Sequence, residues 1–175
     1  MNRTRSIGGL LTTVFIVLLL VVASGCGTIQ HKLVLEKDYQ PKPDAKVTVG
    51  KVSNDIGKTY DIAIEDMLKK ALVDALSDEE LLCTDPQKCS LMTNCRILAY
   101  EKGDAFKRWL MPGWGSTVLS IQCDLLDSDC KVGIIEAKRT VDAGGGYTVG
   151  AWEHVFNHIA FDVVQDIKEK IVVSR

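Results

Sequence analysis

The chain has 175 residues, of which 46% are hydrophobic and 25% are charged, and its formal net charge is −2. These values are typical of a globular protein and exclude a wholly disordered chain. A mildly acidic chain without a long basic run is also a poor candidate for binding nucleic acid, so we expect no such partner.

The first 25 residues have the pattern of an export signal. Two arginines are their only charged residues, and an apolar run from Ile7 to Val22 follows. Basic residues hold the start of such a segment on the cytoplasmic side, whereas the apolar run enters the bilayer. This pattern predicts a signal peptide over residues 1–25. An uncleaved membrane anchor and a soluble secreted form are the alternatives.

The segment Ala23-Ser-Gly-Cys26 resembles the lipobox of bacterial lipoproteins, although Ala23 stands where leucine is usual. The resemblance implies a diacylglyceryl group on the Cys26 sulfur, cleavage before Cys26 and acylation of the new amino group. Each buried methylene contributes about 0.8 kcal/mol, so two or more acyl chains hold a protein at a membrane. Gly27, in place of aspartate, favours the outer membrane under the enterobacterial sorting rule. We therefore expect a lipid-anchored protein of the bacterial cell envelope that faces the periplasm.

Residues 26–45 are predicted to be a tether between this anchor and the folded part. They are polar and contain Pro41 and Pro43, which disfavour a helix and keep the chain extended. A short strand over residues 33–35 is compatible with this prediction. A single domain is expected over residues 46–175.

The domain is predicted to contain four strands and two helices. Alternating patterns predict strands over residues 46–52, 91–100, 116–126 and 131–142. Apolar residues spaced by three and four predict helices over residues 59–76 and 152–171. The order β-α-β-β-β-α indicates an α/β (α+β) fold. We expect a two-layer sandwich with two helices on one face of a mainly antiparallel sheet.

Three segments carry a resemblance to a known family. They are Gly103–Arg108 followed by Pro112-Gly-Trp-Gly115, the strand end Leu125-Leu-Asp127, and the turn Gly144-Gly-Gly-Tyr147 before the last helix. Together they resemble a family of uncharacterised bacterial lipoproteins defined by a domain of unknown function. The resemblance implies a lipobox followed by a small α/β domain, and no established reaction. The layout is also distantly similar to the periplasmic module of the curli secretion lipoprotein, a likeness of topology that says little about function.

Besides the lipobox residue, five cysteines remain, and an oxidising periplasm allows disulfides between them. Cys83 and Cys89 flank a short loop that they could close. Cys95 and Cys123 lie on the same face of two predicted strands, and strand pairing centred near residue 109 would place them opposite each other. An odd number leaves at least one thiol without a partner in the same chain. Inert buried thiols and a zinc site are the alternatives, although no CxxC motif supports zinc.

Two further patterns favour structural interpretations. His154 and His158 have a spacing that would let both bind one metal, but they lie opposite the apolar stripe without a third ligand nearby. We therefore expect both side chains to be exposed. The run Gly144–Gly146 precedes a helix as a phosphate-binding loop does, but the lysine of GxxxxGK[ST] is absent, which favours a tight turn. We expect neither a metal nor a cofactor.

The loop over residues 103–115 is the strongest candidate for an interaction site. Trp109, Pro112 and Trp114 lie in it, next to Lys107 and Arg108. Tryptophan side chains are unfavourable in water, so the loop either folds over an end of the sheet or contacts a partner or a membrane surface. The two basic residues would suit anionic lipid headgroups.

The sequence contains no GxSxG motif and no recognisable catalytic set, which favours a protein that is not an enzyme. The leading hypothesis is a lipid-anchored envelope protein with a binding or assembly role. Its expected partners are the membrane, through Cys26, and another envelope protein. The alternative is a small ligand-binding protein or enzyme with a site near residues 103–115. Exposure of Trp109 or Trp114 on a convex surface would favour the first hypothesis, and a concave pocket with a titratable pair the second.

Overall fold

The computed structural model describes residues 28–42, 44–85, 89–111, 114–142 and 150–172. The predicted signal peptide, Cys26, Pro112 and the Gly144–Gly146 run lie outside the described residues. Among the helices that are described, none has both the length and the apolar character needed to cross a membrane.

Five strands form one sheet in the spatial order β1-β5-β4-β3-β2. Their bounds are Ile29–Leu35 for β1, Val47–Asn54 for β2, Leu91–Glu101 for β3, Thr117–Asp127 for β4 and Cys130–Val141 for β5. β2 and β3 are parallel, and the other neighbouring strands are antiparallel. The mainly antiparallel sheet is therefore confirmed.

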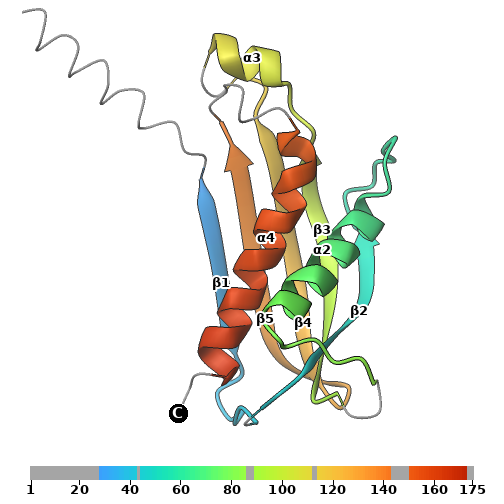
Figure 1. The fold of residues 1–175 in the computed structure, drawn as a ribbon, viewed down its shortest axis with the longest axis vertical. Helices are drawn as coiled ribbons and strands as arrows, with labels where there is room; N and C mark the ends of the chain where they lie inside the picture. The colour runs from blue at the N-terminus through green and yellow to red at the C-terminus, as the bar shows by residue number, and fades with distance from the viewer. Residues whose placement is uncertain (1–27, 43, 86–88, 112–113, 143–149, 173–175) are drawn as a thin grey trace, which may run out of the picture.

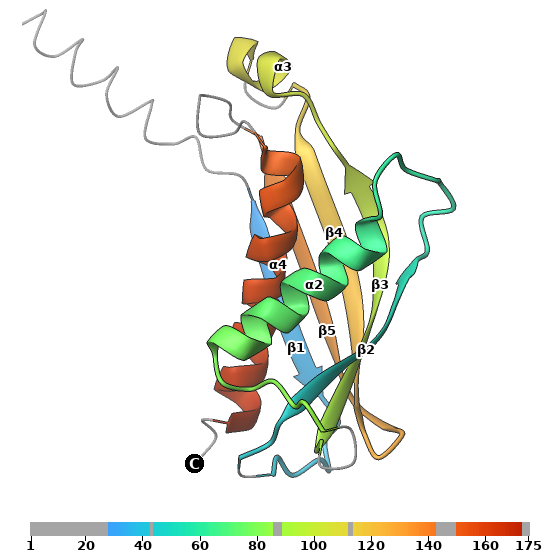
Figure 2. The same ribbon diagram turned by 45° about the vertical axis from the view of Figure 1, so that its right-hand side comes forward.

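Two long helices cover one face of the sheet (Figures 1 and 2). They are α2, Ile64–Asp78, and α4, Ala151–Ile167, which continues into a π-helical turn, Lys168–Val172. The predicted fold class, a sheet with helices packed on one face, is confirmed.

The core lies between the helices and the sheet. Along β4, Leu119, Ile121 and Leu125 are fully buried, whereas Ser120 and the other alternate residues are only half-buried. This alternation arises because successive strand residues point to opposite faces, and only one face is covered. Apolar stripes at helical spacing complete the core from the other side; they include Leu68, Leu72 and Leu76 of α2 and Val155, Ile159 and Val163 of α4.

Strand β1 lies within the range predicted as a tether. It pairs with β5 along its whole length, from Ile29 opposite Arg139 to Leu35 opposite Gly133, and Leu33 is buried. The strand is therefore longer than the short one considered over residues 33–35, and it belongs to the sheet. Its sequence resembles a polar tether because His31, which lies on the same face of the strand as Leu33, is polar. The His31 Nδ1 atom is 3.1 Å from Oδ1 of Asp166 in α4.

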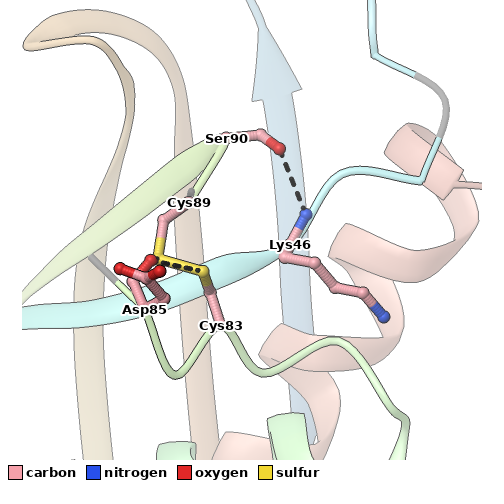
Figure 3. Close-up of a disulfide and its surroundings, with 5 residues drawn as sticks. All are labelled: Lys46, Cys83, Asp85, Cys89 and Ser90. Carbon is pink, nitrogen blue, oxygen red and sulfur yellow. Dashed lines mark hydrogen bonds between the residues drawn. A yellow bond between two sulfur atoms is a disulfide. The ribbon is translucent and has the colours of Figure 1, made fainter. Parts of the chain in front are cut away.

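The part of the chain that the structure describes contains two disulfides. Cys83–Cys89 closes the segment between α2 and β3, next to the start of β2 (Figure 3). Cys83 donates its backbone N–H to the Val47 carbonyl at 2.9 Å. Cys95–Cys123 joins β3 to β4 at directly opposed positions. Cys130, the first residue of β5, is a free exposed thiol.

Candidate functional site

A short helix that the sequence did not predict projects from one end of the sheet. It is α3, Ala105–Leu110, and it lies between β3 and β4 (Figures 1 and 2). The carboxylate of Asp104 caps it by accepting the backbone N–H groups of Phe106 at 2.9 Å and Lys107 at 3.1 Å. We call residues 102–111 and 114–117 the α3 end.

The α3 end is closed by its own backbone. Gly103 and Gly115 have φ angles of +68° and +75°, a conformation that glycine adopts without the steric cost of a side chain. Asp104 donates its N–H to the Gly115 carbonyl at 2.8 Å. This bond brings the two flanks of the helix together.

Arg108 fastens the inner side of α3 to the sheet. It is 2% exposed, and its Nη1 donates to the Gly115 carbonyl and to the Thr117 hydroxyl, both at 2.8 Å. Thr117 in turn donates to the Lys102 carbonyl at 2.9 Å. Desolvation lowers the pKa of the Arg108 guanidinium, and the nearby Asp104 carboxylate opposes that change. The expectation that Arg108 would face anionic headgroups is therefore wrong, whereas Lys107 remains exposed.

We expect Arg108→Ala to destabilise the protein by about 1.5–3 kcal/mol, because it removes hydrogen bonds from a buried charged donor. Urea unfolding followed by fluorescence would measure the change. Lys107→Ala is the matched control, since it removes the neighbouring exposed cation and should leave the unfolding midpoint nearly unchanged. Equal unfolding midpoints for the two variants would contradict the fastening role of Arg108.

The outer side of the α3 end is apolar. Of the ten exposed large hydrophobic side chains among the described residues, five lie here: Phe106, Trp109, Leu110, Met111 and Trp114. Trp109 is 64% exposed and Trp114 is 52% exposed. Phe106 and Trp109 are neighbours with ring centres 6.0 Å apart, and Lys107 Nζ lies 5.9 Å from the centre of the Trp114 ring. The loop does not bury its two tryptophans against the sheet, so a projecting apolar surface remains.

The α3 end is also the end at which β1 begins (Figures 1 and 2). Ile29 is opposite Arg139 of β5, which is opposite Leu119 of β4, two residues after the start of that strand. The carbonyl of Thr28 accepts the backbone N–H of Thr140 at 2.9 Å, so the ladder holds the chain from its first described residue.

The other candidates from the sequence lie apart from the α3 end or have structural roles. His154 and His158 are both exposed on α4, and the pKa of His158 is lowered by partial desolvation and by the nearby positive charges of Arg139 and His154. Within the described ranges, no three His, Cys, Asp or Glu side chains gather as a metal site would require. Cys83, Cys89, Cys95 and Cys123 are held in disulfides.

Two features were not anticipated from the sequence. The first is a partly buried ion pair between Arg139 of β5 and Asp162 of α4, with bonds of 2.6 and 2.7 Å. The second is an open hollow of about 650 Å³ on the face of the sheet opposite the helices. Its lining includes Lys32, Glu136 and Lys138, and no residue of the α3 end.

No protein-family model and no curated protein matches this chain. Among solved structures, the PelC dodecamer from Paraburkholderia phytofirmans matches 83% of this chain and 98% of its own, with 12% identity and a TM-score of 0.55. A second crystal form of that dodecamer, with one substitution, gives 13% identity over the same coverage and the same TM-score of 0.55. A Xanthomonas campestris protein of the DUF330 family covers 77% of this chain and 88% of its own, with 14% identity and a TM-score of 0.49. At these identities, the likeness to PelC is one of fold.

Proposed function

We propose that this protein is a lipid-anchored protein of the bacterial cell envelope, and that it acts by binding or assembly and not by catalysis. The observation that carries the proposal is the α3 end. Five large apolar side chains are exposed there on a projecting surface, which Arg108 fastens to the sheet. An exposed apolar patch that is held in place by buried hydrogen bonds is typical of an interaction site.

The disulfides support an envelope location. Cys83–Cys89 and Cys95–Cys123 are bonds of the kind that persist in an oxidising compartment and are rare in the cytosol. This argument is independent of the signal-like residues 1–25 and of the lipobox at Cys26. Both lines favour a domain that faces the periplasm, and Gly27 favours the outer membrane as the site of the anchor.

The fold supports an assembly role. The PelC protein that shares this fold is a dodecamer. We propose that this chain likewise works as part of an assembly, formed with copies of itself or with another envelope protein.

A ligand-binding protein or enzyme with a site near residues 103–115 is the weaker hypothesis. Such a site needs a concave pocket with a titratable pair, whereas this segment projects and its outer side chains are apolar. The hollow on the open face of the sheet lies elsewhere, and its charged residues Lys32, Glu136 and Lys138 are exposed to solvent.

The proposal is tested by comparing the wild type with Cys26→Ala in a bacterial host. We expect the wild type to be processed, labelled by radioactive palmitate and recovered with the membranes. The variant should keep its signal peptide and take up no label. Normal maturation of Cys26→Ala would contradict the lipid anchor.

The same preparation tests the assembly role. After extraction in detergent, with and without prior crosslinking in the cell, the wild type should migrate as a complex larger than one chain. A lipidated protein that is always recovered as a monomer without a crosslinked neighbour would contradict assembly while leaving the anchor intact.

A further inference from the structure

We propose that the α3 end lies on the lipid surface, with Trp109 and Trp114 in the interface of the membrane that holds the Cys26 anchor. This inference rests on the proposed lipid anchor and names the partner of the same site. The occupant of this apolar surface is a phospholipid bilayer, and contacts with other chains of an assembly use other parts of the domain.

The first step is the position of the anchor relative to the sheet. Cys26 precedes Thr28 by two residues, and each residue spans at most about 3.6 Å, so the Cα atoms of these residues lie within about 7 Å of each other. Thr28 is fixed to β5 through Thr140, at the α3 end of the sheet. A free tether over residues 26–45 would have allowed any orientation of the domain. With β1 in the sheet, the acyl chains and the α3 end must lie on the same side of the protein.

The second step is the chemistry of the surface. Tryptophan is enriched at membrane–water interfaces because its large ring is apolar and its N–H remains able to bond with water or headgroups. Trp109 and Trp114 are accompanied by the apolar side chains of Phe106, Leu110 and Met111, all more than half exposed. A surface of this composition, carried next to acyl chains, is suited to the headgroup region of a bilayer.

The charges of the α3 end are compatible with this contact. Lys107 is exposed beside Trp114 and can approach lipid phosphates. The Asp104 carboxylate accepts the N–H groups that cap α3, and Lys102 pairs with Asp61 at 3.6 Å. Glu101 is an exposed acid at the end of β3, and its negative charge offsets the attraction of Lys107 to anionic lipids. We therefore expect neutral as well as anionic lipids to be bound.

The third step concerns how rigidly the apolar surface is held by the rest of the domain. Because Arg108 and the Asp104 cap fix α3 before contact, insertion requires little ordering of the loop. The anchor also keeps the α3 end at the membrane, so the second contact is effectively intramolecular. The two contacts together orient the domain, with the β4–β5 turn and the adjacent exposed Cys130 directed away from the bilayer.

The test uses the lipidated protein reconstituted into phosphatidylcholine vesicles whose acyl chains carry bromine, which quenches nearby tryptophan. Three variants each keep one tryptophan: Trp114→Phe/Trp152→Phe, Trp109→Phe/Trp152→Phe and Trp109→Phe/Trp114→Phe. Trp152, on the first turn of α4, is half-buried and lies against Lys102 of the α3 end, so it is a control for a tryptophan at the same end of the protein that does not insert. We expect Trp109 and Trp114 to lose most of their emission and Trp152 to keep most of its emission.

A label on Cys130 provides the control for orientation. A thiol-reactive fluorophore at this exposed position should be unaffected by the bromolipids and should react in intact vesicles. Co-flotation of the protein with the vesicles reports the anchor separately. Co-flotation with Trp109 and Trp114 quenched no more than Trp152 would overturn the inference. Quenching of the Cys130 label alone would also overturn the inference. A wild-type protein that carries no acyl group on Cys26 and does not float would instead overturn the proposed function.

Discussion

Arg139→Met is expected to destabilise the domain by about 3 kcal/mol, the lower end of the range for buried pairs, because it leaves the buried Asp162 carboxylate without its partner. Arg139 forms a two-bond contact with Asp162, through Nε at 2.6 Å and Nη2 at 2.7 Å. The side chains of Arg139 and Asp162 are 19% and 7% exposed. The pair joins β5 to the helix layer, so its loss should lower the melting temperature by on the order of 10 °C for a domain of this size.

Chemical unfolding would measure this effect, and a double variant would separate its causes. Arg139→Met/Asp162→Leu replaces both charges by apolar groups and should recover most of the loss. Lys70→Met is the matched control, since it removes the cation of an exposed ion pair with Asp74 and should leave stability nearly unchanged. If Arg139→Met were as mild as Lys70→Met, the pair would have no structural role.

The sequence was sufficient for the elements that have a regular apolar pattern. The alternation of Leu119, Ile121 and Leu125 predicted β4, and the stripe of α4 predicted the last helix. The pairing of β3 with β4 could also be predicted from the sequence. If the connection between the two strands is centred near residue 109, Cys95 is placed opposite Cys123, as the structure shows. Local periodicity and turn position carry this information within a short stretch of chain.

The elements that were missed depend on partners distant in sequence. His31 is separated by 135 residues from Asp166, and without that carboxylate a histidine on the same face as Leu33 looks like part of a polar tether. Asp162 and Asp166 lie on the buried side of α4, where an apolar stripe alone would exclude them. Helix α3 has six residues, which is too short for a helical period to be recognised.

Arg108 shows the same limit at the candidate site. From the sequence, Lys107 and Arg108 were equally suited to contact anionic headgroups. In the structure, Lys107 and Trp109 on either side of Arg108 are exposed, whereas Arg108 is buried. The structure instead aims it at the Gly115 carbonyl and the Thr117 hydroxyl. The orientation of α3 relative to the sheet decides which of Lys107, Arg108 and Trp109 is buried, and the local sequence does not contain that orientation.

The second large effect is expected from the disulfide between β3 and β4. Cys95→Ala/Cys123→Ala opens a loop with a sequence separation of 28 residues, which corresponds to a loss of about 3–4 kcal/mol from the entropy of the unfolded chain. Both cysteines are buried in the core, at 1% and 0% exposure, so the smaller alanines also remove packing. Urea unfolding of the oxidised proteins would measure the difference.

Cys83→Ala/Cys89→Ala is the matched comparison. This bond spans a separation of only 6 residues, at partly exposed positions, and its removal should cost about 2 kcal/mol. Every protein in the series should carry Cys130→Ala, because the free exposed thiol could otherwise exchange with the remaining disulfide. A larger loss from opening the short loop than from opening the long one would contradict the assignment of the β3–β4 disulfide as the principal covalent support of the core. The larger loss is expected for Cys95–Cys123 because it closes the longer loop and so restricts the unfolded chain more.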